Sequence, residues 1–518
     1  MKKKPSIHTI QIPLCTTGWE KQVIDKRFHA IAHIHNVMVK HAKKQLRILS
    51  FHTRYQQMRQ EYMTLLSEAK EAAKKGRRLQ REKQARKTEL SNAMKEIRLA
   101  MGLSDFSFRV YIKKCQHRFK TCISSQQAQK EASRVWRGVE KVLFGNGGQV
   151  HFKKFMDFST ISGASNKNGV RFYREDLSIT WLGLKIPCKR PKKDSDMEYM
   201  TKSLSGEICY CELKRQMFPN GWHYYVTVYL KGDAPKKVRK IGDGTMGIDP
   251  GVSTMAGVSD TNVFLRELAP DCDRYNRKIV KLQRELERSK RTSNPQRYHP
   301  DGRLKKQGRG KWVFSNTYLK KQKRLKSLYR QKALYIRVSH KTLANEMLRD
   351  SRHFIVEEMF YRGLQKRVKQ TERKKEVSVI PQRDGSVKQV RKFKKKKRFG
   401  KSLNNRAPAT FLSILEQKAL FYGGSYEKVD TREFRASQYE HDTDTYKKIP
   451  LSQRKKQIDG HIVQRDLYSA FLIKNTDKDF KHPDREKCSY DFQNFIVLHD
   501  ACIQKIKQTC TANSCFGF

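Results

Sequence analysis

The stretch Met246–Asp260 reads MGIDPGVSTMAGVSD and predicts a β-hairpin whose first strand ends on an aspartate, Asp249. The apolar residues before it are typical of a buried strand, the Pro-Gly pair after it is a turn signal, and a second apolar strand runs to Val258. Because a strand end is rigid, a carboxylate there can be held in place for a divalent metal ion. An aspartate before Pro-Gly is also ordinary turn chemistry, so the motif needs support from elsewhere in the chain.

Two further carboxylates lie on predicted elements. The run HFIVEEMFY predicts a strand that is apolar on both faces, as in a sheet covered on both sides, and Glu357 ends it. Glu358 points to the opposite face by strand alternation, so we expect only Glu357 to face a site. Asp466 lies on a helix predicted from about Gly460 to Lys474, on the side that packs against the sheet. We expect no basic neighbour on that helix face to pair with Asp466, so a cation has to compensate its burial.

We predict that Asp249, Glu357 and Asp466 meet as one metal centre and are its catalytic residues. Carboxylates about 5 Å apart repel each other by roughly 3 kcal/mol at an effective dielectric of 20, so without metal they resist ionising together. Two Mg²⁺ (or Mn²⁺) ions about 4 Å apart turn them into ligands, and oxygen-only ligands suit these ions rather than zinc. The chemistry of such a centre is hydrolysis of a phosphodiester.

The composition points to a polyanionic partner. The chain has 518 residues, with 111 Lys and Arg against 51 Asp and Glu, a formal net charge of +60. Such an excess repels itself in a free protein and favours binding to a long nucleic acid. No apolar run approaches the ~20 residues that span a bilayer, and polar residues interrupt the basic N-terminus, so we expect no membrane contact and a cytoplasmic location. The 11 cysteines include no CxxC pair, which favours buried reduced thiols over a zinc site.

The periodicity of the sequence changes along the chain and predicts a multidomain α+β protein. The predicted segments are a first strand at 1–16, a helical domain at 17–148, the rest of a small β-barrel or sandwich at 149–240, an α/β domain at 241–475 with a basic helical insertion at 265–350 and a basic loop at 365–401, and a helical C-terminal tail at 476–518. We expect the basic loop to become ordered on a phosphate backbone.

The order of the three acidic motifs resembles that of a known family. GIDPG, IVEEM with RGLQKR, and QRDLYSAFLI resemble the split RuvC-like nuclease, an RNase H-like domain, of TnpB, the transposon-encoded RNA-guided DNA endonucleases related to type V CRISPR effectors. VWRGVEKVLFGNGGQVHFKKF is similar to the family's junction between recognition domain and barrel. RAPATFLSILEQKALFYGGSYEKVDTREFRASQ is similar to its segment ahead of the third motif. The resemblance covers most of the chain in order.

The resemblance implies a wedge-like β-barrel domain with an inserted helical recognition domain, followed by a RuvC-like nuclease domain. It also implies a guide RNA, from a transposon-end transcript or a CRISPR array, that pairs with target double-stranded DNA beside a short flanking motif before the DNA is cleaved. We expect nucleic-acid contacts at Lys153, Lys154, Arg362, Lys366, Arg367, Lys394, Lys395, Lys396, Lys397, Arg398, Arg406, Arg435, Ser437 and Gln438.

One region departs from the family pattern. Many members carry a four-cysteine zinc ribbon between the second and third motifs, but the segment from Ser437 to Asp466 contains no cysteine. The ribbon-like region 437–460 is therefore either rebuilt without metal or lost, and no zinc is predicted.

Other functions stay open at this point. A DDE-type transposase or strand transferase shares the fold and the metals, although its acidic order is Asp, Asp, Glu rather than Asp, Glu, Asp. A nuclease-inactive RNA-guided repressor has the same outline, and a plain RNA-binding scaffold has the same charge. The sequence also leaves the oligomeric state open.

Overall fold

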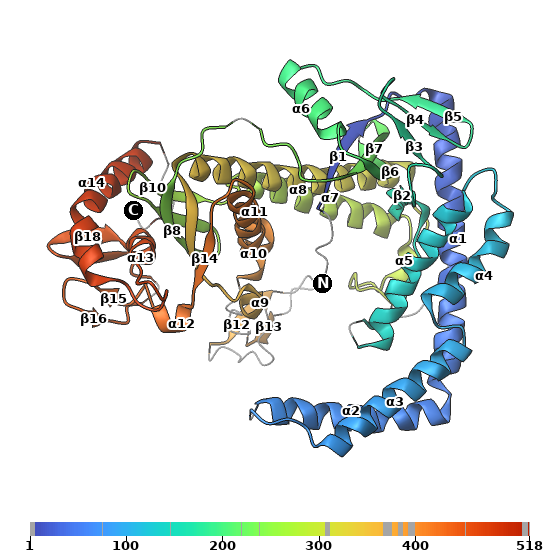
Figure 1. Ribbon diagram of the computed structural model, residues 1–518, viewed down its shortest axis with the longest axis horizontal. Helices are drawn as coiled ribbons and strands as arrows, with labels where there is room; N and C mark the ends of the chain where they lie inside the picture. The colour runs from blue at the N-terminus through green and yellow to red at the C-terminus, as the bar shows by residue number, and fades with distance from the viewer. Residues whose placement is uncertain are drawn as a thin grey trace. The chain divides into compact units, whose positions relative to one another are not determined.

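The computed structural model describes residues 6–74, 76–145, 147–218, 220–237, 239–305, 311–365, 376–381, 387–391, 399–450, 452–509 and 516. The chain divides into two compact units, Met1–Lys237 and Val238–Phe518 (Figure 1). Both combine helices with sheets, as the sequence predicted. Among the described residues, none of the helices combines the length and apolar character needed to cross a membrane.

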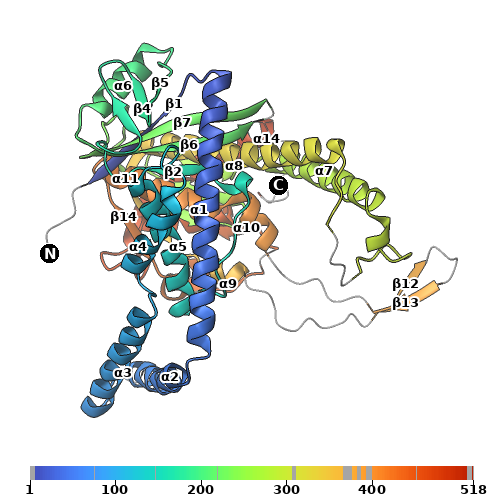
Figure 2. The ribbon, with the colours of Figure 1, turned by 90° about the vertical axis from the view of Figure 1, so that its right-hand side faces the viewer.

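The first unit is built on a long helix, α1 (Gly18–Ser50), which begins at a capping box formed by Thr17 and Glu20. One side of α1 is fully buried and packs with α4 (Asp105–His117) and α5 (Ser125–Leu143) (Figure 1). Two further helices, α2 (Thr53–Lys74) and α3 (Arg81–Ala100), form a hairpin beyond the end of α1 (Figure 2).

The strands of the first unit form open sheets. β1 (Ile7–Pro13), β7 (Gly221–Lys231), β6 (Ile208–Phe218) and β2 (Thr160–Ser162) pair antiparallel in the order β1-β7-β6-β2. A smaller sheet consists of β3 (Arg171–Tyr173), β4 (Ser178–Trp181) and β5 (Leu184–Pro187), and α6 (Asp194–Leu204) follows it. The sequence predicted a small β-barrel or sandwich, and among the described residues no closed barrel is seen, because the outer strands β1 and β2 do not pair and β2 has only three residues.

The second unit contains a mixed five-stranded sheet. Its strands are β8 (Gly244–Pro250), β9 (Thr254–Val258), β10 (Val263–Glu267), β11 (Ser351–Glu357) and β14 (Tyr426–Val429), in the order β10-β9-β8-β11-β14. The first three form an antiparallel meander, which includes the predicted hairpin, and β11 and β14 run parallel to β8.

Helices cover both faces of this sheet. Met246, Ile248, Phe354 and Val356 point to one face, where they form a core with α8 (Asn316–Asp350) and α11 (Pro408–Phe421). On the opposite face, Ile355 packs with α13 (Arg465–Lys474) and α14 (Arg485–Thr509). Since strand residues alternate, the residues that follow Ile248 and Val356 face α13.

Two junctions fix the helices against the sheet. The 35-residue helix α8 ends at Asp350 and β11 begins at Ser351, so no loop separates them. On the other face α13 lies very close to β8, because a Cβ atom placed on Gly247 would come within 2.2 Å of the Ala470 carbonyl oxygen. Only glycine allows this approach of helix to strand.

The remaining elements of the second unit surround this framework. They are α7 (Cys272–Thr292), which packs along α8, the 3₁₀ turn Pro295–Arg297, α9 (Tyr361–Gln365), β12 (Ser378–Pro381), β13 (Val387–Val390), α10 (Gly400–Arg406), α12 (Thr431–Phe434), β15 (Tyr439–Glu440), β16 (Thr445–Tyr446), β17 (Lys455–Ile458) and β18 (His461–Gln464).

The third acidic helix begins later than the sequence predicted. Residues 461–464 form strand β18, which pairs with β17 across the two-residue turn Asp459-Gly460, and the helix begins only at Arg465. Both turn residues have positive φ, 45° for Asp459 and 76° for Gly460. An Asp-Gly pair between two short apolar segments is a hairpin signal, and it overrides the helical pattern predicted for this stretch.

The cysteine-free region 437–460 contains the small hairpin β15–β16 and the first strand of the hairpin β17–β18, and aromatic side chains pack at its centre. Tyr439 and Ile458 are buried, and Nδ1 of His441 lies 2.8 Å from the Tyr468 hydroxyl. The ammonium of Lys456 is also buried and lies 3.9 Å from the carboxylate of Glu440. Aromatic packing and this ion pair thus occupy the centre of the region.

Candidate active site

Two of the three predicted carboxylates are brought into direct contact by the sheet. β8 and β11 are parallel neighbours in which Ile248 pairs with Val356, so Asp249 and Glu357 end the two strands at the same level. Both face α13, and the charge of Glu357 acts on the carboxyl group of Asp249. Glu357 is buried whereas Glu358 is exposed, as strand alternation predicted.

The carboxylates of Asp249, Glu357 and Asp466 carry like charges, which disfavour ionisation of Asp249. Burial raises the pKa of Asp249 well above its ordinary value of 3.8, and the charges of Glu357 and Asp466 raise it further. Burial also raises the pKa of Glu357 above its ordinary value of 4.5, with a contribution from the charge of Asp466. The pair therefore retains a proton at a pH at which exposed carboxylates have lost theirs. Such a pair is a favourable position for a cation.

Asp466 lies close enough to act on both groups, but its carboxylate is paired with arginines. It sits in the first turn of α13, and Nη2 of Arg465 lies 2.9 Å from one of its oxygens. Nη1 of Arg454 lies 3.3 Å from the other oxygen. The prediction that Asp466 has no local ion pair is wrong, because Arg465 directly precedes it and the β17–β18 hairpin returns Arg454 to the start of the helix.

The three carboxylates suit a hard divalent cation in chemistry, although the described residues do not form a preorganised metal-binding cluster. Within the part of the chain that the structure describes, no group of three His, Cys, Asp or Glu side chains is arranged to hold a metal ion. Asp249 and Glu357 lie at the ends of neighbouring strands, and the carboxylate of Asp466 forms ion pairs with Arg454 and Arg465. All three offer only oxygen atoms, which suits Mg²⁺ or Mn²⁺. Their role as metal ligands stays a prediction.

The metal-free pair predicts a pH-dependent stability. Because the pKa values of both carboxyls are raised on folding, the folded state loses stability as the pH rises from about 4 through the folded values. The isosteric change Asp249→Asn removes one of the two charges. We expect the variant to melt at a higher temperature than the wild type in EDTA at pH 8, and we expect the difference to shrink toward pH 4. Thermal melts across this range measure it, and equal melting temperatures at pH 8 would contradict the coupling.

The predicted nucleic-acid contacts differ in their placement. Lys153, Lys154, Arg362, Arg435 and Ser437 are exposed, and Gln438 is half-buried. The guanidinium of Arg435 stacks over the ring of Tyr446, 4.5 Å from its centre. The other predicted contacts, Lys366, Arg367 and Lys394 to Arg398, lie outside the described residues.

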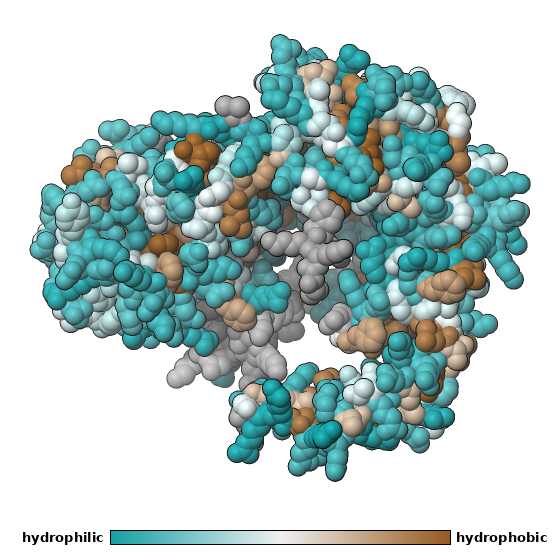
Figure 3. All heavy atoms as spheres, viewed as in Figure 1, coloured by the Kyte–Doolittle hydropathy of each residue, from teal (hydrophilic) through white to brown (hydrophobic). Residues whose placement is uncertain are grey.

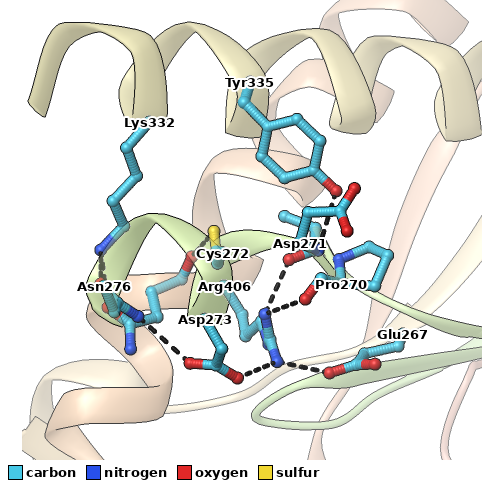
Figure 4. Close-up of polar contacts among 11 residues, drawn as sticks. Glu267, Pro270, Asp271, Cys272, Asp273, Asn276, Lys332, Tyr335 and Arg406 are labelled. Carbon is cyan, nitrogen blue, oxygen red and sulfur yellow. Dashed lines mark hydrogen bonds and ion pairs between the residues drawn. The ribbon is translucent and has the colours of Figure 1, made fainter. Parts of the chain in front are cut away.

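Arg406 has a structural placement instead. It is 8% exposed, and Nη1 donates a hydrogen bond of 2.7 Å to the Ala269 carbonyl. Nη2 contacts the carboxylates of Glu267 and Asp273, as Figure 4 shows. These bonds tie the end of α10 to the end of β10 and the start of α7. The prediction of a phosphate contact at Arg406 is corrected, because its guanidinium is directed toward acceptors of the protein itself.

The sequence predicted a basic helical insertion at 265–350 but did not identify the row of basic residues on α7. Five exposed side chains recur at three- and four-residue steps and share one helix face: Arg277, Lys281, Arg284, Arg288 and Arg291. They line a groove of about 1300 Å³ together with Tyr329 and Lys332 of α8. Hydrophilic residues cover most of the face shown in Figure 3. The helical spacing of the basic residues would have identified this row, but the high overall charge obscured it.

The comparisons with known proteins find only distant similarity. No protein-family model and no curated protein sequence matches the chain. Among solved structures, it is similar to a cryo-EM structure of a Cas12f1–sgRNA–target DNA complex, with a TM-score of 0.43 and 12% identity over 91% of this chain and 99% of that chain. A cryo-EM structure of a CRISPR-Cas12f ternary complex gives a TM-score of 0.26 and 13% identity over 90% and 99%. A crystal structure of a Cas12i1 R-loop complex before target DNA cleavage gives 0.24 and 7% over 81% and 58%. These three solved structures are complexes of Cas12f1, Cas12f and Cas12i1.

Proposed function

We propose that this protein is an RNA-guided DNA endonuclease in which Asp249, Glu357 and Asp466 hold the metal ions for phosphodiester hydrolysis. The observation that carries the proposal is that Asp249 and Glu357 end neighbouring parallel strands at the same level, where burial raises the pKa of both carboxyls and the charge of Glu357 raises the pKa of Asp249 further. A sheet that serves only as a scaffold gains nothing from this repulsion. The sequence motifs around these residues supply the family resemblance.

In this proposal each residue has a defined task. Asp249 and Glu357 are fixed by their strands and form the rigid half of the centre. Asp466 approaches from the start of α13, and its partners Arg454 and Arg465 hold it in place before any ion arrives. Two bound Mg²⁺ or Mn²⁺ ions would supply an activated water and neutralise the leaving oxygen.

The proposed partners are a guide RNA and target double-stranded DNA. The formal net charge of +60 and the basic groove on α7 support a long nucleic acid as the partner. Base pairing between guide and target would provide the sequence specificity, while the protein contacts the phosphate backbone.

The test is to purify the full chain with its bound RNA, sequence that RNA, and offer a DNA duplex that contains the matching sequence. We expect cleavage that requires Mg²⁺ or Mn²⁺ and stops in EDTA. Joining of the cut end to a second DNA would favour the strand-transferase alternative. Binding to the matched duplex without any cleavage would favour the repressor.

The α7 groove gives a second test, on binding rather than cleavage. Arg288→Glu places a negative charge in the basic row, so we expect weaker binding of the purified RNA and a slope of log K against log salt that is shallower by about one unit. Lys278→Glu is the matched control, because it makes the same charge change on the same helix but outside the groove. Filter binding at several salt concentrations measures both variants. Equal losses in the two would show that net charge alone, and not the groove, governs binding.

A further inference from the structure

The buried hydroxyl group of a tyrosine lies within electrostatic reach of the carboxylates of Asp249 and Glu357. Tyr361 begins α9, directly after the segment that leaves β11 at Glu357. Its hydroxyl oxygen is buried, and no hydrogen-bond partner for it is found among the described residues. Leaving a buried donor unpaired is unfavourable, and a phenylalanine would fill the same space without this loss.

The hydroxyl lies within electrostatic reach of the candidate centre. Burial raises the pKa of Tyr361 above its ordinary value of 10.0, and the charges of Asp249, Tyr426 and Glu357 raise it further. The group therefore stays protonated and is available as a donor. Asp249 and Glu357 are acceptors within electrostatic reach, but no hydrogen bond from the Tyr361 hydroxyl to either of them is found. Within the described part of the chain, the Tyr361 hydroxyl therefore lacks an acceptor. A negatively charged oxygen of a bound ligand would supply one.

We propose that the Tyr361 hydroxyl donates a hydrogen bond to a non-bridging oxygen of the DNA phosphodiester held at Asp249 and Glu357. This inference rests on the proposed function and adds a substrate-binding residue to it. A phosphate is the anionic oxygen group that the substrate brings to the ends of β8 and β11. A neutral donor suits this position because it binds the phosphate without competing with the metal ions for the carboxylates.

The variant Tyr361→Phe tests the inference in the full chain with its guide RNA. We expect the melting temperature of the nucleic-acid-free protein to be unchanged or higher, because no hydrogen bond is lost. We expect single-turnover cleavage of matched DNA to fall on the order of 10²-fold, which is the usual effect of removing one donor to a reacting oxygen. Tyr426→Phe is the control, since burial and Glu416, not the two carboxylates, act on that hydroxyl.

Sulfur substitution at the scissile phosphate identifies the contact. A phosphorothioate of one configuration weakens the hydrogen bond in the wild type, so the ratio of oxygen to sulfur rates for that diastereomer should be larger in the wild type than in Tyr361→Phe. In Ca²⁺, which replaces Mg²⁺ to give a binding assay, the variant should be stabilised less by the matched DNA strand. An unchanged sulfur ratio, or a lower melting temperature of the free variant, would overturn the inference. If wild type and Glu357→Gln cleave equally, the proposed function itself fails instead.

Discussion

Replacing Glu357 with glutamine is expected to lower cleavage of matched DNA by about 10³-fold or more, while Glu358→Gln leaves the rate close to that of the wild type. The two residues are adjacent in sequence, but Glu357 is buried and ends the strand next to that of Asp249, whereas the side chain of Glu358 is exposed. The amide keeps the shape of the side chain and removes the charge that would bind a cation. Single-turnover cleavage in Mg²⁺ measures the effect.

The Glu358→Gln variant is the control, because it makes the same chemical change at the adjacent, exposed position. Both variants should copurify with the same amount of RNA, because neither residue belongs to the basic groove. Glu357→Gln should also melt at a higher temperature than the wild type in EDTA, since it removes a charge that burial disfavours and that raises the pKa of Asp249. Full activity of Glu357→Gln would remove the carboxylate pair from the mechanism.

The substitution Gly247→Ala is expected to have the second large effect, on the fold. The new methyl group would lie 2.2 Å from the Ala470 carbonyl oxygen and 2.3 Å from the Lys474 nitrogen, both atoms of the α13 backbone. Helix and strand therefore have to separate, at a destabilisation of more than about 3 kcal/mol. A displacement of about 1 Å of the helix that carries Asp466 is also expected to slow cleavage by roughly 10²-fold. Calorimetry measures the first effect, because the chain divides into two units that need not unfold together.

Gly400→Ala is the matched control for this experiment. Gly400 begins α10 in the same unit, and a Cβ atom built there would meet no other atom within 4 Å. Alanine is favoured over glycine in a helix by about 1 kcal/mol, so this variant should be as stable as the wild type or more stable. An unchanged transition in Gly247→Ala would show that α13 does not pack on β8 as described.

The parts of the fold that were predicted correctly are those whose sequence signals lie within a few residues of one another. The hairpin around Asp249 was predicted from its turn residues, and the buried strand that ends at Glu357 from its apolar run, because both signals lie within a few residues. The helical domain predicted to begin at residue 17 likewise begins at a local signal, the capping box of Thr17 and Glu20 that precedes α1.

The errors concern contacts between distant segments or competing local signals. The Asp459-Gly460 turn was overlooked because a helical pattern continued through it, and this displaced the predicted start of the third acidic helix. The pairing of Arg454 with Asp466 depends on that hairpin. Arg406 could not be distinguished from a phosphate-binding arginine, because its acceptors lie far away in the sequence. Barrel closure depends on pairing between strands at opposite ends of the first unit.

The direct junction of α8 with β11 has a mechanical consequence. A helix of 35 residues is about 50 Å long and stiff, and here it continues into the strand that carries Glu357 without an intervening hinge. A force on the distant end of α8 is therefore transmitted directly to β11 and to the carboxylate of Glu357. A force applied at any position along α8 therefore acts on the end of β11, where Glu357 lies next to Asp249.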